Sequence, residues 1–196
     1  SQADATALPH AADVARIEGK KTLGLELALQ FGWSLPTAII YPTGGGTGLI
    51  GMWKAFEELL AAGWVQGAPP RLYTVQSSGC APVVRAFDAG ADRCEPWSEP
   101  WTVASGLRVP GPLGDRLMLR ALRESGGGAV AVDDAVLERE AAETSAAEGI
   151  DLSPEGGAAV AAARLLRERG AIGGDDRVVV FNTGAGWLYR TPGAFA

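Results

Sequence analysis

A glycine-rich segment at residues 43–48 (TGGGTG) has the clearest chemistry in the sequence. It follows a short apolar run and precedes a helical pattern, which indicates a loop between a strand and a helix. Glycine permits positive φ and lets the backbone approach a ligand without an intervening Cβ. The N–H groups of such a loop attract an anion, aided by the helix dipole. The segment therefore predicts an anion site, to which the Thr47 hydroxyl adds a donor.

The residues around the loop indicate which kind of anion it could bind. A nucleoside triphosphate site would end in Gly-Lys followed by Ser or Thr, and the sequence lacks this ending. Gly46, Gly48 and Gly51 match the dinucleotide fingerprint, but that fingerprint also predicts an acid after the next strand. The next predicted strand ends in residues 75–79 (VQSSG), which contain no acid. A single phosphate monoester therefore fits the loop better than a pyrophosphate.

Several other kinds of chemistry lack the residues they need. A catalytic triad would rest on one histidine, His10, in an N-terminal stretch rich in alanine. Cys80 and Cys94 lack the spacing of a zinc site, so we expect two reduced thiols in a cytoplasmic protein. The net charge is −6, from 17 basic and 23 acidic residues, without a basic stripe for nucleic acid. No apolar run reaches the roughly 18 residues of a membrane span, so neither nucleic acid nor membrane is expected as a partner.

The pattern along the chain predicts alternating strands and helices. The predicted strands are residues 38–41, 72–75, 129–132 and 178–181. The predicted helices are residues 22–31, 49–62, 81–89, 115–124, 133–148 and 154–169. This alternation is typical of an α/β fold with a doubly wound, mostly parallel sheet, in which ligands bind at the carboxyl ends of strands. We expect residues 1–20 to form a tail or linker and residues 21–196 to form the phosphate-binding domain.

Five segments together give the chain a family resemblance. They are residues 18–22 (EGKKT), 41–48 (YPTGGGTG), 102–107 (TVASGL), 153–156 (SPEG) and 181–184 (FNTG). In this order they resemble the threonine synthase branch of the fold-type II pyridoxal-phosphate enzymes, over residues 16–189. The set is more specific than any one of its motifs. The resemblance implies the large domain of such an enzyme, with pyridoxal 5'-phosphate as the cofactor.

The resemblance also implies roles for individual residues. It assigns the cofactor phosphate to the backbone of Gly44, Gly45, Gly46, Thr47 and Gly48. It places the Thr183 hydroxyl against the pyridine nitrogen. A neutral hydroxyl there does not enforce protonation of the nitrogen, and so it tunes how strongly the ring draws electrons. From the residues alone, the alternative role for Thr183 is a turn or capping hydroxyl.

The implied reaction converts O-phosphohomoserine and water to threonine and phosphate, so the implied substrate is a small phosphorylated amino acid. A dianionic phosphate is bound by arginine or lysine. The candidates are Arg16, Lys20, Lys21 and Arg108, each of which could instead be an ordinary surface charge. Glu155 either faces the pocket from the start of a helix or complements the dipole of that helix.

One residue of the family pattern is missing. These enzymes anchor the cofactor through a lysine that typically follows a serine and precedes a charged residue. None of the three lysines, Lys20, Lys21 and Lys54, has that context. The chain also begins roughly half-way along the family pattern, so we expect a C-terminal fragment that is inactive on its own. Its expected partner is the missing N-terminal half, or a second copy in a homodimer that covers the same apolar surface.

Three other functions are open at this stage. A serine/threonine dehydratase or cysteine synthase relative would need no second phosphate site. A non-catalytic module would use the loop to bind a phosphorylated metabolite. A dinucleotide-dependent oxidoreductase is the least favoured, because no acid follows Gln76.

Overall fold

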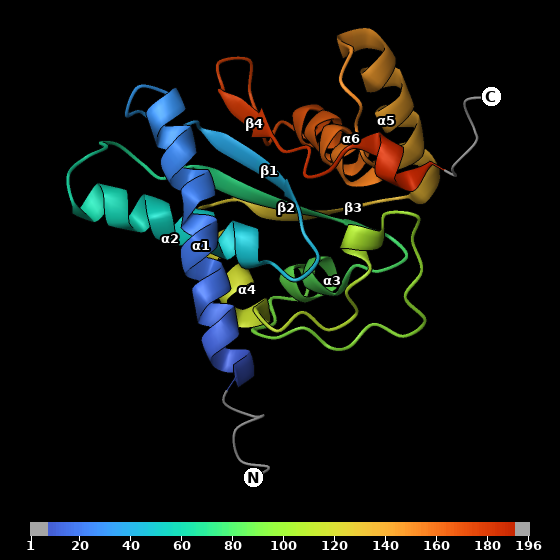
Figure 1. Cartoon of the computed structure of the whole chain (residues 1–196), viewed down its shortest axis with the longest axis horizontal. Coiled ribbons are helices and arrows are strands. Elements are labelled where there is room, and N and C mark those ends of the chain that lie inside the picture. Colours follow the sequence, from blue (N-terminus) through green and yellow to red (C-terminus); the bar gives the residue numbers. More distant parts are fainter. Residues whose placement is uncertain (1–7, 191–196) are drawn as a thin grey trace.

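The computed structural model describes residues 8–190, with side chains from Val14 onward. Within these residues, four strands form one parallel sheet in the order β3-β2-β1-β4 (Figure 1). The strands are β1 (Ala38–Pro42), β2 (Arg71–Ser77), β3 (Gly128–Val132) and β4 (Val178–Val180). Helices cover both faces, as a parallel sheet requires. The predicted doubly wound α/β fold is confirmed.

The helices form two layers, one on each face of the sheet (Figure 1). One layer consists of α1 (Leu8–Gln30), α2 (Thr47–Ala61), α3 (Pro82–Asp88) and α4 (Asp115–Glu124). The other consists of α5 (Asp134–Glu148) and α6 (Pro154–Glu168). Two short 3-10 turns, η1 (Ser105–Leu107) and η2 (Gly186–Tyr189), lie after α3 and after β4 respectively. Each layer has its own buried apolar cluster, the first centred on Phe56 and Leu119 and the second on Ile40 and Ala162.

The direction of the strand order reverses at β1. The chain passes from β1 to β2 and β3 on one side, and then returns across the other face to place β4 beside β1. Ala38 of β1 therefore pairs both with Arg71 of β2 and with Val178 of β4. In open α/β sheets the crevice at such a reversal, outside the carboxyl ends of the strands, is where ligands bind. The loops after β1 and β4 meet this condition.

The N-terminal helix is longer than the sequence predicts. The sequence predicts a tail or linker over residues 1–20 and a first helix from residue 22, whereas α1 already begins at Leu8; residues 1–7 lie outside the described part. The apolar pattern of this half is weak, and close packing on α2 holds it instead. A Cβ added at Gly51 of α2 would lie 2.7 Å from the Lys20 Cβ and 3.0 Å from the Ile17 carbonyl oxygen. Gly51 thus lets the two helices approach closely.

The other predicted elements agree with the structure to within about two residues at each end, as helix and strand ends usually do. Asp115–Glu124 is helical as predicted. Ser153 caps α6, because its Oγ accepts a hydrogen bond from the Gly156 N–H at 3.2 Å and Pro154 occupies the first turn.

Within the described part of the chain, no helix is long and apolar enough to cross a membrane.

Candidate functional site

The glycine loop leaves β1 and enters α2 with its backbone donors unpaired. Thr43 still belongs to the sheet, since its N–H donates to the Val75 carbonyl at 3.0 Å. Among residues 8–190, no N–H of residues 44–49 donates a hydrogen bond, and no side chain caps α2 at Gly46. Backbone donors in folded proteins are nearly always satisfied. A row of free donors at the start of a 15-residue helix is the arrangement that binds a phosphate.

The loop glycines have two different roles. At three of them, other protein atoms leave no room for a side chain. A Cβ added to Gly44 would lie 2.2 Å from the Gly106 carbonyl oxygen. A Cβ added to Gly46 would lie 2.0 Å from the Met118 sulfur, and one added to Gly48 would lie 2.1 Å from the Tyr41 hydroxyl. Gly45 differs, because it is exposed and an added Cβ there would meet nothing within 4 Å. The glycine content therefore partly reflects packing. Gly45 is the position where open space reaches the backbone.

A second loop, residues 102–107, lies directly against the glycine loop. Its Gly106 carbonyl is the group that crowds Gly44. The Gly106 N–H donates to Glu155 Oε1 at 2.8 Å, and the Tyr189 hydroxyl donates to the same oxygen at 2.5 Å. Glu155 is buried. It therefore binds a neighbouring loop from the first turn of α6, where its charge also complements the helix dipole.

Asp134 fixes the other end of this second loop. Its Oδ1 accepts hydrogen bonds from Ser77 Oγ at 2.8 Å and Thr102 Oγ1 at 2.7 Å, and its Oδ2 accepts one from the Val103 N–H at 2.8 Å. A carboxylate that accepts three hydrogen bonds holds its donors firmly. The first residue of α5 thus ties residues 102–107 to the end of β2.

The segment after β4 comes to the same edge of the sheet. Asn182 Oδ1 accepts hydrogen bonds from the Ser153 N–H at 3.2 Å and the Ser153 Oγ at 3.3 Å. An added Cβ at Gly156 would lie 2.2 Å from this oxygen. These contacts bring the FNTG and SPEG segments together, and they leave the next residue, Thr183, exposed beyond the end of β4. Its contact with a pyridine nitrogen stays a prediction.

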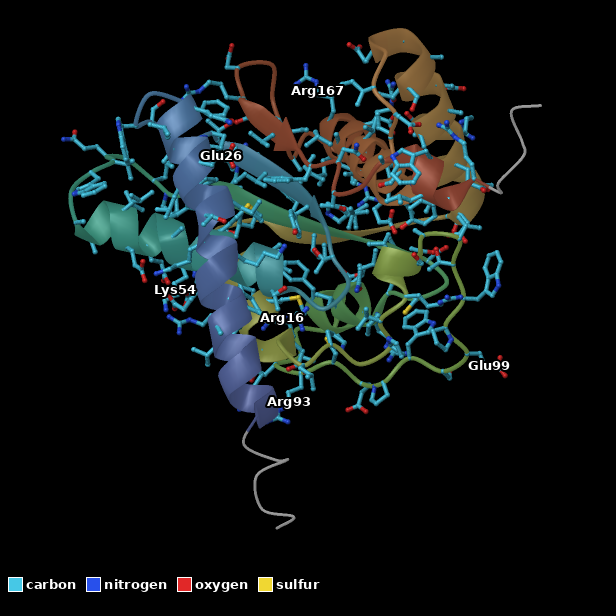
Figure 2. All side chains as sticks on the ribbon, viewed as in Figure 1. Arg16, Glu26, Lys54, Arg93, Glu99 and Arg167 are labelled. Carbon is cyan, nitrogen blue, oxygen red and sulfur yellow. The ribbon has the colours of Figure 1, made fainter. Side chains whose placement is uncertain are left out.

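The four candidates for a substrate phosphate site separate in the structure. Lys21 pairs with Glu58 at 2.7 Å, within an ion-pair network that joins α1 to α2. Lys20 and Arg16 are exposed on α1, and Figure 2 shows Arg16 and Lys54 on this helical layer. Arg108 is exposed directly after η1, at the end of the loop that contacts Gly44. Arg108 alone of the four belongs to a segment at the carboxyl edge.

Neither cysteine is suited to act as a nucleophile. Both Cys80 and Cys94 are free thiols. Burial raises the pKa of the Cys80 thiol, and burial together with the nearby Asp115 carboxylate raises the pKa of Cys94 to about 11. A thiol in this range is protonated at neutral pH, and only the thiolate is reactive.

Sequence reasoning missed a buried polar side chain that forms a hydrogen bond with the glycine loop. Gln76 is fully buried in β2, and its Nε2 donates to the Thr43 carbonyl at 3.2 Å. The available signal was a long amide side chain at the carboxyl end of an otherwise buried strand, where a polar group needs a partner. Glu155 and Asp134 gave no local sign of the loops that they hold.

Comparison with known proteins gives consistent matches over most of the chain. Residues 1–184 match the family model described as pyridoxal-phosphate dependent enzyme. Threonine synthase from Methanosarcina acetivorans is 35% identical over 169 residues, which are 86% of this chain and 42% of that protein. Cysteate synthase from Methanoculleus marisnigri is 37% identical over 192 residues, or 90% of this chain and 43% of that protein. The chain thus spans less than half the length of these relatives.

Solved structures agree on the fold. Threonine deaminase isoform 2 from Solanum lycopersicum has a TM-score of 0.68 at 21% identity, covering 86% of this chain and 45% of that one. An L-serine ammonia-lyase from Rhizomucor miehei has a TM-score of 0.68 at 24% identity, covering 89% and 55%. The resemblance stated from the sequence is confirmed: the chain belongs to the family of pyridoxal-phosphate-dependent enzymes.

Proposed function

We propose that this chain forms the phosphate-binding wall of an enzyme that converts O-phosphohomoserine and water to threonine and phosphate. The observation that carries the proposal is the row of unpaired N–H groups at residues 44–49, at the point where the strand order reverses. The identity to threonine synthases supports the choice of reaction. A substrate that carries its own phosphate also needs a cationic side chain to bind it, and Arg108 can supply that charge.

The residues at the carboxyl edge fit the cofactor of the family. The free donors of residues 44–49 suit a phosphate monoester, and the open space at Gly45 admits it. Pyridoxal phosphate, when bound, supplies an electron sink for the substrate carbon that bears the amino group. Thr183 presents a neutral hydroxyl from the neighbouring loop. Such a partner accepts or donates a hydrogen bond without fixing a charge on the ring nitrogen.

The substrate phosphate is assigned to Arg108. An arginine binds a phosphate dianion through two parallel hydrogen bonds. Arg108 is exposed and follows the loop that lies against Gly44. By contrast, Lys21 is held by two carboxylates, Glu18 at 2.8 Å and Glu58 at 2.7 Å. These ion pairs make Lys21 a structural residue of the α1–α2 contact.

The chain by itself is expected to bind the cofactor without turnover. Covalent catalysis needs an amine at the cofactor. Lys54 pairs with Glu18, Lys21 pairs with Glu58, and Lys20 is exposed on α1. The amine is therefore expected from a further segment or a partner subunit that packs on the carboxyl edge. A cytoplasmic location is part of the proposal, since two free thiols suit a reducing compartment.

A second candidate is a cysteate synthase function, because a protein of that name is 37% identical to this chain. A serine/threonine dehydratase or cysteine synthase function is less favoured, since the neighbours of the deaminase type are under 25% identical. A non-catalytic module that binds phosphorylated metabolites is the third alternative.

A chimera tests these functions directly. This chain replaces the matching 169 residues of the Methanosarcina enzyme, and the chimera is assayed with O-phosphohomoserine, serine, threonine and O-acetylserine. We expect threonine and phosphate in equal amounts from O-phosphohomoserine. Arg108→Met in the chimera should raise KM for that substrate by at least about tenfold, by the loss of a charged hydrogen-bonding pair.

Four outcomes would contradict the proposal. Turnover of serine or threonine alone would favour the dehydratase, and cysteate formed from O-acetylserine and added sulfite, with release of acetate, would favour the second candidate. A folded chimera that binds phosphate but converts no substrate would favour the non-catalytic module. Turnover of O-phosphohomoserine by the isolated chain would contradict the expected inactivity.

A further inference from the structure

Gln76 connects the glycine loop to the helix that follows the neighbouring strand. The side chain is fully buried and uses both ends of its amide. Nε2 donates to the Thr43 carbonyl at 3.2 Å, and Oε1 accepts hydrogen bonds from the Val83 N–H at 2.8 Å and the Val84 N–H at 3.2 Å. A buried amide with all these partners satisfied adopts one orientation.

The bond to Thr43 has a geometric consequence for the next residue. In a trans peptide unit, the C=O of one residue and the N–H of the next point in opposite directions within one plane. Holding the Thr43 carbonyl therefore fixes the direction of the Gly44 N–H. Thr43 is also held by its own N–H, which donates to Val75 at 3.0 Å, and by its Oγ1, which donates to Tyr41 at 2.9 Å. The Gly44 N–H, which is the first N–H of the loop without an acceptor, thus follows a residue whose N–H, carbonyl and hydroxyl are all hydrogen-bonded.

The bonds to Val83 and Val84 fix the other end of the bridge. Helix α3 has Ala81 at its N-cap and no side-chain cap of its own. Without Gln76, two buried N–H groups in its first turn would lack an acceptor. The Gln76 Oε1 therefore acts as the cap, although it comes from the preceding strand. One amide links the loop after β1 to the first turn of the helix after β2.

We propose that Gln76 is the positioning residue of the glycine loop, which sets the direction of the Gly44 N–H for binding the cofactor phosphate. The inference rests on the proposed function for the phosphate site. Gln76 makes no contact with the ligand in this account, and it acts through the Thr43–Gly44 peptide unit. A merely structural residue would change stability without changing the phosphate site of the folded protein.

A near-isosteric variant separates the two roles. Gln76→Glu keeps an oxygen for Val83 and Val84, but its second oxygen donates to Thr43 only when the carboxyl is protonated. Burial and the acceptor at the Thr43 carbonyl favour the neutral acid, and we expect them to outweigh the Val83 and Val84 N–H groups, which favour the carboxylate; the pKa of this carboxyl should then lie above the ordinary glutamate range. The variant should therefore match the wild type at the acid end of the titration. It should lose phosphate affinity as the pH rises and the donor is lost.

The measurement is a titration of the wild type and variants with inorganic phosphate from about pH 5 to about pH 8, followed in amide correlation spectra. The ratio of variant to wild-type Kd at each pH removes the titration of phosphate itself. We expect a ratio near one at the acid end and at least about tenfold weaker binding at the alkaline end. The Gly44 amide resonance of the ligand-free variant should shift over the same pH range.

Two further variants serve as controls. Gln76→Met carries no charge, so its expected roughly tenfold weaker binding at every pH would exclude simple repulsion between phosphate and the carboxylate of the Gln76→Glu variant. Thr74→Val changes a buried residue of the same strand whose hydroxyl makes no hydrogen bond among the described residues. Thr74→Val should bind phosphate as the wild type does.

The outcomes distinguish this inference from the function on which it rests. Wild-type affinity in folded Gln76→Met, or a pH-independent ratio near one in Gln76→Glu, would overturn the role of Gln76 alone. Absence of phosphate binding by the wild-type chain would overturn the phosphate site and the inference together. If Gln76→Met fails to fold, the pH dependence of Gln76→Glu decides the question, because one protein is compared with itself.

Discussion

The two ends of the parallel sheet are built differently. At the amino end, polar groups bind one another: Asp176 accepts from the Gly173 N–H at 2.6 Å and pairs with Arg71 at 2.7 Å, and Arg177 donates to the Leu35 carbonyl at 2.8 Å. At the carboxyl end, the N–H groups of residues 44–49 have no acceptor within the described chain. The same strands thus end in a closed edge on one side and an open edge on the other.

The residues at the amino end therefore stabilise the fold, whereas the N–H groups at the carboxyl end are available to bind a ligand. Substitutions at the amino edge should change stability and leave phosphate binding intact. Substitutions in open space at the carboxyl edge should change binding and leave stability intact. Substitutions at positions that serve both packing and phosphate binding should reduce both stability and affinity, and they should have the largest effects.

Gly44→Ala should have the largest effect, because packing and binding meet at this residue. The new Cβ would lie 2.2 Å from the Gly106 carbonyl oxygen, so the second loop must move away. Overpacking of this kind costs roughly 1–3 kcal/mol of unfolding free energy. Phosphate binding should also be lost, which calorimetric titration and urea unfolding would measure together. Unchanged stability would show that the second loop moves away from Gly44 without a measurable cost.

Gly45→Ala is the matched substitution at the neighbouring residue. The added methyl group meets no atom within 4 Å, and Gly45 does not have a positive φ, so the melting temperature should stay within a degree or two of the wild type. A phosphate seated on this backbone would collide with the methyl group. We expect at least about tenfold weaker phosphate binding, worth ~1.4 kcal/mol. Full affinity in this variant would move the anion away from Gly45.

Arg71→Met tests the amino edge alone. Arg71 loses its ion pair with Asp176 and its hydrogen bond to the Ala171 carbonyl. The pair is partly exposed, so the expected cost is about 1 kcal/mol, or a fall in melting temperature of roughly 2–4 °C. Phosphate affinity should equal that of the wild type. A parallel loss of affinity would mean that the two edges are coupled through the sheet.

Acid titration should give the smallest effect at the amino edge. The Gly173 N–H, followed by Arg71 and Thr37, lowers the pKa of Asp176 to about 2. The folded state thus favours the ionised form, so this contribution is present above the ordinary aspartate range near ~4. It is lost as the pH falls from there towards about 2, because protonation then favours the unfolded chain. Urea unfolding of the wild type should show this loss, and Asp176→Asn should lack it.

The sequence was most informative where one segment determines its own structure. The buried strands and the Ser153-Pro154 helix start carry local signals, and both were predicted. The sequence predicted α1 to begin too late, because the part before residue 22 depends on packing against α2 around Ile17 and Lys20, where Gly51 lets the two helices approach closely. Long-range packing of this kind has no periodic pattern in one sequence.

The segments of the candidate site were recognisable in the sequence, and the ligand contacts assigned to them stay predictions. The glycine loop, Thr183 and Glu155 stood in recognisable segments. The hydrogen bonds of Gln76 to Thr43 and of Asp134 to Thr102 join residues more than 30 positions apart, so no local spacing reveals them. The sequence likewise gives no sign that protein atoms pack closely against Gly44, Gly46 and Gly48. The sequence-based prediction therefore explained all the glycines by anion binding.

The pairing of β1 with β4 bears on how the protein reaches its native state. Ala38 and Val178 lie next to each other in the sheet but 140 residues apart in the chain, as the Thr37–Arg177 hydrogen bond also shows. Closing so long a loop lowers the chain entropy before the contacts that stabilise the pairing can form, so such pairings form late and slowly. The loops after β1 and β4 then come together only when the last strand docks. A refolding chain should acquire its complete ligand site in its final kinetic phase, and cofactor capture would mark the end of folding.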